Sequence, residues 1–296
     1  MALQSSGSIT LAQIASEFGD SQPHSLSEFY AGGSAGVLSA GAPNVPSSGA
    51  IDFNDFYGAS NVASVSVASN ATDRNAATLF GSDWSPSIPK ILQIESGVEV
   101  GASSLSNYAI NVPSGMGGTL NIKVYGTVSG AGGDGSSTGT GGDGGTAIYI
   151  ASSNVTVSNA GTIRGGGGGG GKGGNGSPGN TTPMSPTLTC YGGAGGTGGA
   201  GGNGQGYDQS QSNGSGGGAG GSKFASPSSG AAFCNWVPGR YTDGSPGYSG
   251  GNGGTYGNAG NAGTSGSPGG AAGKYIQLSG VSYTLANGGT LQGTAP

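Results

Sequence analysis

The sequence is poor in the side chains from which most active sites and hydrophobic cores are built. Of its 296 residues, 7% are charged, 7% are aromatic and 32% are apolar, and it has a single histidine, His24. Ordinary domains carry about 25% charged and 45–50% apolar residues. This composition excludes one conventional globule of this length, and it disfavours catalysis. We therefore predict no enzymatic activity, no catalytic residue, no metal site and no cofactor.

Charge of one sign and long apolar runs are also missing. The formal net charge is −5, with −6 in residues 1–129 and +1 in residues 130–296, so neither half has the basic excess of a nucleic-acid-binding surface. No run of 18 or more apolar residues exists, which predicts no membrane insertion. Residues 1–6 have neither a basic region nor an apolar stretch, which predicts no signal peptide and synthesis in a cytoplasm.

Residues 1–61 contain a short internal repeat. Ser5–Ile9 recurs as Ser47–Ile51, and Leu26–Tyr30 recurs as Phe53–Tyr57. Apolar residues at i and i+3 behind a small capping residue predict three short helices, over 10–18, 25–31 and 52–57. We expect an attachment module that gains order against a partner, with a self-contained cap as the alternative. Its docking candidates are Leu11, Ile14, Leu26, Phe29, Tyr30, Phe53, Phe56 and Tyr57.

Residues 62–129 have the apolar density that the rest of the chain lacks. The segment 120–125 alternates apolar and polar residues with period 2, and segments 91–95 and 98–100 flank a turn at Ser96 and Gly97. This pattern predicts a small β domain.

A strand-like signature brackets the remainder of the chain. Gly126–Gly130 matches Gly161–Gly165 and Gly289–Gly293, each with the order Gly-Thr-apolar-x-Gly. A longer match aligns 146–165 with 274–293 at a constant offset of 128 residues. We expect each copy to form a pair of strands, with the copy at 274–293 packing beside the earlier one and closing a glycine-rich domain over 130–296.

Glycine is what the sequence has in excess, with 71 residues, of which 52 lie among the 144 positions of 130–273. From 251 to 269 glycine recurs at every third position, and 192–203 also repeats with period three. This is the period of the extended polyproline-II type of helix. Collagen shares the period but needs abundant proline. We therefore predict a bundle of polyglycine-II helices held together by backbone hydrogen bonds, because buried backbone groups must be paired.

Three insertions, 180–191, 207–213 and 222–249, interrupt the glycine repeats and hold most large side chains of this region. Aromatic residues and arginine on loops of a rigid scaffold are typical of recognition surfaces; the alternative is that they cover the end of the bundle. Cys190 and Cys234 lie in different insertions and are candidates for a disulfide. The recognition candidates are Met184, Leu188, Tyr191, Tyr207, Phe224, Phe233, Trp236, Arg240, Tyr241 and Tyr248.

Segments 3–9, 29–30 and 53–58 resemble the N-terminal parts of tailed-bacteriophage tail proteins, and the glycine-rich body resembles the distal tail-fibre adhesins of T-even-type phages. The resemblance implies a virion protein that docks on other tail proteins through its N-terminal part. It also implies that loops of a polyglycine-II sandwich bind a bacterial surface receptor, an outer-membrane protein or a polysaccharide. The alternatives are a purely structural tail-tip or fibre component, as a homo-oligomer such as a trimer, and ice or polysaccharide binding by a flat repeat face.

Overall fold

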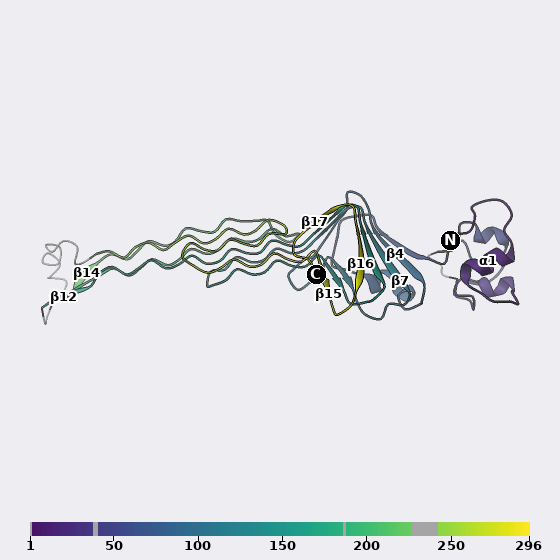
Figure 1. Cartoon of the computed structure of the whole chain (residues 1–296), viewed down its shortest axis with the longest axis horizontal. Coiled ribbons are helices and arrows are strands. Elements are labelled where there is room, and N and C mark those ends of the chain that lie inside the picture. The colour runs from purple at the N-terminus through teal and green to yellow at the C-terminus, as the bar shows by residue number, and fades with distance from the viewer. Residues whose placement is uncertain (1, 38–40, 186–187, 227–241) are drawn as a thin grey trace.

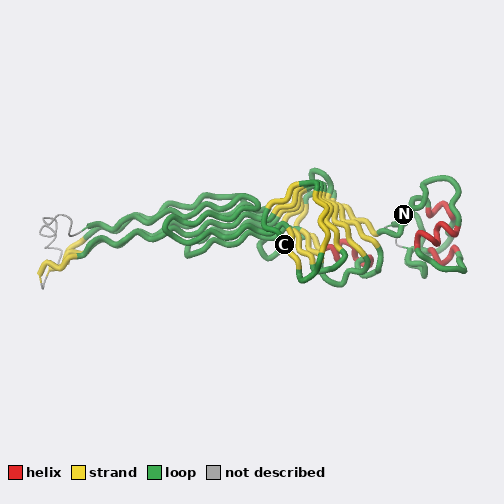
Figure 2. Tube along the Cα trace, viewed as in Figure 1, coloured by secondary structure: helices red, strands yellow, loops and turns green. Residues whose placement is uncertain are grey.

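A computed structural model describes residues 2–37, 41–185, 188–226 and 242–296. Three parts follow one another along the long axis of the molecule: a small helical module at the N-terminus, a stack of strands, and a long glycine-rich body (Figures 1 and 2). Helices are few, and strands make up most of the regular structure. The C-terminus lies in the middle of the molecule, where the strands meet the glycine-rich body.

The N-terminal module contains helix α1 (Leu11–Phe18) and the 3-10 helices η1 (Leu26–Phe29) and η2 (Phe53–Phe56). All three begin alike, because the third residue of each helix accepts a hydrogen bond from the backbone N–H of the capping residue. The pairs are Thr10 N with Gln13 Oε1, Ser25 N with Glu28 Oε2 and Asp52 N with Asp55 Oδ2, each at 2.8 Å. These capping boxes satisfy donors that a helix start leaves unpaired.

The module has a hydrophobic core of its own. The rings of Phe18, Phe29 and Phe56 surround one point with centroids 6.3–6.4 Å apart, and Phe29, Phe56 and Ile14 are fully buried. Tyr30 donates a hydrogen bond to the carbonyl of Gly49, and Tyr57 donates one to the carbonyl of Gly7, so the repeated segments hold one another. These contacts lie within the module itself, which favours the self-contained cap over a module that gains order only against a partner.

The middle of the chain winds as a parallel β-solenoid. Successive turns add one strand to each of three sheets, with the orders β1-β4-β7-β10-β16, β2-β5-β8-β11-β17 and β3-β6-β9-β15. Helix α2 and the 3-10 helix η3 follow β3. The bounds of the strands and of these two helices are β1 Ala63–Val67, β2 Ala71–Thr72, β3 Arg74–Asn75, α2 Ala76–Phe80, η3 Gly81–Asp83, β4 Pro89–Ile94, β5 Glu99–Gly101, β6 Ile110–Val112, β7 Thr119–Val124, β8 Thr127–Ser129, β9 Ile148–Ile150, β10 Val155–Asn159, β11 Thr162–Arg164, β15 Ile276–Leu278, β16 Tyr283–Asn287 and β17 Thr290–Gln292.

The period-2 pattern of the strands decides what fills the solenoid. Leu92, Ile122 and Val157 pair in register on β4, β7 and β10, and all are fully buried. Lys90 also points inward, is 1% exposed, and donates from Nζ to three backbone carbonyls, those of Pro86 (2.8 Å), Gly117 (2.8 Å) and Ile88 (3.3 Å). Burial lowers the pKa of Lys90, and the charge of Asp83 partly opposes this effect.

Register explains the repeats seen in the sequence. The offset of 128 residues pairs β9 with β15, β10 with β16 and β11 with β17, so the two copies are neighbouring turns of one solenoid. The three Gly-Thr-apolar elements are the adjacent strands β8, β11 and β17. Asn159 donates to Asn287 at 2.8 Å within this stack.

The predicted turn at Ser96 and Gly97 joins β4 to β5, which belong to different sheets, so it is a corner of the solenoid. One sequence-based interpretation needs correction. The boundary placed between residues 129 and 130 is crossed by strand pairing, because 146–164 and 274–293 continue the sheets of 62–129. The glycine-rich body is thus a pair of insertions into the solenoid, 130–145 and 165–273.

The glycine-rich runs 165–180 and 192–206 are neither helix nor strand, yet their backbones pair regularly. Gly167, Gly170 and Gly173 donate to the carbonyls of Gln205, Gly202 and Gly199, each at 2.7–2.8 Å, so a bond recurs at every third residue between antiparallel runs. A Cβ added at Gly168 would lie 2.1 Å from the carbonyl oxygen of Gly270. Neighbouring backbones therefore lie too close for any side chain between them.

At some positions of the body, a backbone N–H donates to the oxygen of a short polar side chain and not to a backbone carbonyl. Asn203 Oδ1 accepts from Gly135 N (2.9 Å), Asn252 Oδ1 accepts from Gly214 N (3.0 Å), and Asp143 Oδ1 accepts from Ala271 N (2.7 Å). The residues between the glycines thus complete the backbone pairing.

Candidate functional site

The far end of the glycine-rich body carries a small antiparallel sheet, which we call the distal sheet (Figure 1). Its strands are β12 (Thr182–Ser185), β13 (Leu188–Tyr191) and β14 (Phe224–Ser226), in the order β12-β13-β14. The glycine repeats stop on both sides of it, and the non-repetitive insertions 180–191 and 222–249 provide its strands.

Two exposed aromatic side chains lie next to each other on the distal sheet. Tyr191 pairs with Phe224 across β13 and β14, and their rings stack with centroids 5.0 Å apart and planes 12° apart. Tyr191 is 38% exposed and Phe224 is 56% exposed. Stacking holds both rings in one orientation, so the pair presents a pre-ordered apolar surface.

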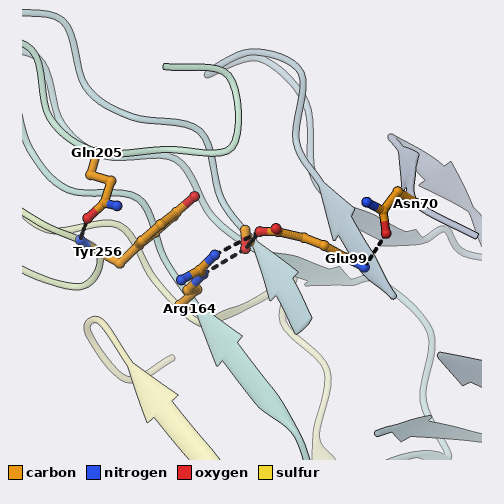
Figure 3. A network of polar contacts seen from close by, with 6 residues as sticks. Asn70, Glu99, Arg164, Gln205 and Tyr256 are labelled. Carbon is orange, nitrogen blue, oxygen red and sulfur yellow. Dashed lines mark hydrogen bonds and ion pairs between the residues drawn. The ribbon is translucent and has the colours of Figure 1, made fainter. Parts of the chain in front are cut away.

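A second set of side chains joins the body to the solenoid, and we call it the junction cluster (Figure 3). Arg164 at the end of β11 donates to Glu99 Oε1 (2.8 Å) and to Ser129 Oγ (2.8 Å), and Ser129 in turn donates to Glu99 (2.5 Å). The guanidinium carbon of Arg164 lies 3.6 Å from the ring centroid of Tyr256, which belongs to the glycine-rich body. The Arg164 side chain thus contacts side chains from two other turns of the solenoid and from the glycine-rich body.

At the same joint, an aromatic ring of the body packs directly against the backbone of the solenoid. A Cβ added at Gly101 would lie 1.9 Å from the ring of Tyr207, so the absence of a side chain on β5 makes room for the ring. Burial raises the pKa of Tyr256, while the positive charge of Arg164 acts in the opposite direction. The joint is a structural contact that sets where the body leaves the solenoid.

Within the described parts of the chain, no group of three or more His, Cys, Asp or Glu side chains could hold a metal ion. No helix among the described residues is long and apolar enough to cross a membrane.

Residues 60–296 match the sequence model of the family described as phage tail fibre adhesin Gp38. The chain belongs to this family. No curated protein matches it. It is also similar, at 18% identity and a TM-score of 0.47 over the full length of both chains, to the crystal structure of the gp37-gp38 adhesin tip complex of the bacteriophage S16 long tail fiber.

Family membership makes this chain an adhesin of a bacteriophage tail fibre, and thus a component of the virion tail. Members of this family act in host attachment as binding proteins. The matched range contains the solenoid and the glycine-rich body, and it begins where the N-terminal module ends.

The structure brings some of the recognition candidates together and separates others. Met184, Leu188, Tyr191 and Phe224 lie on the strands of the distal sheet. Tyr248 is 46% exposed but lies along the body, where its backbone bonds to Gly174 and Gly199. Tyr207 is at the opposite end, against Gly101, which corrects its assignment to the recognition surface. Phe233, Trp236, Arg240 and Tyr241 lie outside the described residues.

The candidate disulfide is described at one end only. Cys190 on β13 is 1% exposed and is not a free thiol, whereas Cys234 lies outside the described residues. Its pairing with Cys190 stays a prediction.

Burial divides the docking candidates of the module. Ile14, Phe29 and Phe56 are fully buried, so they form the core and have no surface to offer a partner. Leu11, Leu26, Tyr30 and Tyr57 are half-buried. Phe53 is 41% exposed and is the candidate whose ring is most available.

Sequence reasoning did not single out the junction cluster. Its signal was present, because Arg164 occupies the position that Ser129 and Gln292 hold in the other two Gly-Thr-apolar elements. A lone cation in an otherwise uncharged repeat marks a place where the repeat meets another part of the fold.

Proposed function

We propose that this adhesin contacts the bacterial surface through its distal sheet and the adjoining insertions, and docks on the tail fibre through its N-terminal module. The observation that carries this proposal is the stacked, exposed pair Tyr191 and Phe224 at the end of the molecule farthest from the module. Exposed aromatic residues dominate the energetics of many interfaces. The insertion that starts at β14 also holds Trp236, Arg240 and Tyr241, which we assign to the same surface.

We interpret the glycine-rich body as a bundle of polyglycine-II helices. Backbone hydrogen bonds at every third residue and carbonyls within contact of each enclosed glycine support this interpretation. Such a bundle is a rigid spacer, because each run is paired along its length to its neighbours. It holds the distal sheet away from the virion. The mechanism on this proposal is reversible adhesion without catalysis.

Docking through the module follows from its independence. Its core is separate from that of the solenoid, and its three capped turns repeat one surface pattern. Phe53 begins one of these turns and is exposed. We propose that a tail protein binds these turns, since nothing in the module's own core requires Phe53 to be apolar.

Adsorption tests the receptor-binding proposal. Purified protein should bind host cells and block infection, and the double variant Tyr191→Ala, Phe224→Ala should weaken binding at least about tenfold, as expected for interface hot spots. The matched control is Tyr125→Ala, which removes an aromatic side chain that is 46% exposed on the solenoid. Cell binding that survives the double variant, or is lost equally in the control, rejects the distal sheet as the binding surface.

The alternative is a purely structural fibre component. It predicts no binding of purified protein to host cells, together with normal incorporation into virions. Removal of residues 1–61 separates the two roles, because on our proposal the truncated protein still binds cells but no longer joins the particle. The molecular mass in solution tests whether the protein forms a homo-oligomer.

A further inference from the structure

The outer face of the sheet β3-β6-β9-β15 carries a small polar pocket, which we call the flank pocket. Its volume is about 190 Å³. It lies on the solenoid, and none of its lining residues belongs to the distal sheet or to the N-terminal module. Its lining residues are Asp73, Asn75, Ser106, Asn107, Tyr108 and Asn111.

Strand register builds the floor of this pocket. Asn75 on β3 pairs with Asn111 on β6, and Asn111 pairs with Tyr149 on β9. The flanking residues Ile110 and Val112 are fully buried inside the solenoid, so Asn111 points to the outer face. Two amides and one aromatic ring therefore stand in a row across three turns.

A hydrogen-bond network around Asp73, the only carboxylate in the lining, holds the walls of the pocket. Asp73 accepts hydrogen bonds from the backbone N–H of Ser103 (2.9 Å), from the Ser103 hydroxyl and from Asn107 Nδ2 (3.1 Å). These bonds fix the loop 103–108 over β3. On the other side, the ring of Tyr108 stacks on Tyr149 with centroids 4.6 Å apart and planes 12° apart. The pocket is thus pre-formed.

One polar atom in the floor is left without a partner. Asn111 Oδ1 is buried and has no hydrogen-bond partner among the described residues. Asn75 Oδ1 accepts from the N–H of Thr78 (3.3 Å) to cap α2, which leaves its amide nitrogen free to donate. A buried acceptor without a donor costs about 1–3 kcal/mol, so a ligand hydroxyl that pairs with this oxygen once the Asn111 side chain turns toward the pocket would remove that cost.

The lining restricts the chemistry of the ligand. No Lys, Arg or His lines the pocket, which argues against a phosphate or carboxylate. Its single carboxylate, Asp73, already accepts three hydrogen bonds, which argues against a metal ion. What remains is a set of amide and hydroxyl donors and acceptors beside an aromatic ring. This set suits a polyol with an apolar C–H face. The volume lies below the roughly 300–1,000 Å³ of sites for drug-sized ligands, so it suits one ring.

We infer that the flank pocket binds a single neutral sugar ring. Hydroxyl groups of the ring pair with Asn75, Asn107 and Asn111, and one face of the ring packs on Tyr108. The inference is independent of the distal sheet, because no residue of the pocket lies in the insertions 180–191 or 222–249. It gives the adhesin a second, weaker contact for surface polysaccharide along its side.

A titration of the full ¹⁵N-labelled chain tests this inference. The probes are the methyl pyranosides of glucose, galactose, mannose, rhamnose and N-acetylglucosamine, with glucuronic acid and CaCl₂ as charged controls. We expect at least one neutral pyranoside to shift the side-chain amide signals of Asn75, Asn107 and Asn111 in a saturable way at millimolar concentration. If none does, or if only a charged probe does, the inference is wrong.

Variants then locate the binding. Asn111→Ala and Tyr108→Ala should each weaken the binding of that sugar by about tenfold, and Asn111→Ser provides a second variant if Asn111→Ala does not fold. The matched control is Tyr283→Phe, in another polar pocket on the solenoid lined by residues that include Asn154 and Thr284. Binding that survives the first two variants, or that depends on Tyr283, overturns the assignment to the flank pocket.

Discussion

The solenoid and the glycine-rich body are neighbours in one chain, yet they solve burial in opposite ways. In the solenoid, stacked side chains such as Leu92 and Ile122 fill the interior, and the backbone lies around them. In the body, the backbone itself fills the interior, and a Cβ at Gly168 or Gly169 would lie within 2.1 Å of a carbonyl oxygen. Burial therefore does not require large apolar side chains, provided that every backbone donor finds an acceptor.

The same comparison accounts for where variation can occur. A solenoid strand must keep its alternation, and an enclosed run of the body must keep its glycines. Neither constraint applies to the distal sheet and its insertions, since they lie beyond the last paired repeats. Side chains can therefore change there without loss of either scaffold, as the proposed receptor-binding role requires.

The largest expected effect separates the two kinds of interior. Gly168→Val should destabilise the body by more than about 3 kcal/mol, because overpacking against backbone cannot be relieved by a change of rotamer. Limited proteolysis should then cut within 165–273 while the solenoid stays intact. The control is Gly216→Ala, where an added Cβ meets nothing within 4 Å. Equal protection of both variants would contradict an enclosed run.

The reverse substitution tests the solenoid. Ile122→Ala removes a fully buried side chain and should lower the free energy of unfolding by about 2–5 kcal/mol through the cavity it leaves. Thermal denaturation followed by circular dichroism measures this loss. Val65→Ala, at a half-buried site on the first strand, should cost less. A loss at Ile122 no larger than at Val65 would mean that the solenoid core is not the main source of its stability.

A smaller effect is expected where the two regions meet. Arg164→Ala removes an ion pair and the contact with Tyr256, and should destabilise the junction by about 1–2 kcal/mol. Hydrogen exchange should rise at the amide of Gly257, which donates to the Gly165 carbonyl, and at the amide of Gly165, which donates to the Gln292 carbonyl. Arg164→Lys keeps the charge but loses the planar fork, so an intermediate effect is expected. Unchanged exchange in both variants would show that backbone pairing alone holds the joint.

The smallest effect concerns the polar residues between the glycines. Asn203→Ala removes the acceptor of Gly135 N and should cost about 1 kcal/mol. Hydrogen exchange of the Gly135 amide measures it directly. Asn203→Asp keeps an acceptor oxygen at this place and serves as the control. If both variants exchange at the wild-type rate, side-chain oxygens do not complete the pairing of the body.

Much of the fold follows from periodicities in the sequence. The period-2 segments predicted strands, the offset of 128 residues predicted which strands lie side by side, and the period of three predicted regular spacing of the enclosed glycines. The candidate site was predicted in part. Tyr191 and Phe224 do lie together, whereas Tyr207, also an aromatic residue in an insertion, lies at the other end of the body. Local composition carries no information on which end of the body an insertion occupies.

By itself, the sequence determined whether a segment can form an interior of side chains or an interior of backbone. Side-chain alternation and glycine spacing are local properties, and each one directly limits how closely neighbouring backbones can pack. Only the tertiary structure decided that the solenoid continues through 146–164 and 274–293, and that the body is inserted into its corners. Only it placed Arg164 against Glu99 and Tyr256, residues far apart in the chain. Such long-range pairings depend on how loops close and how turns stack, and neither is encoded in any single segment.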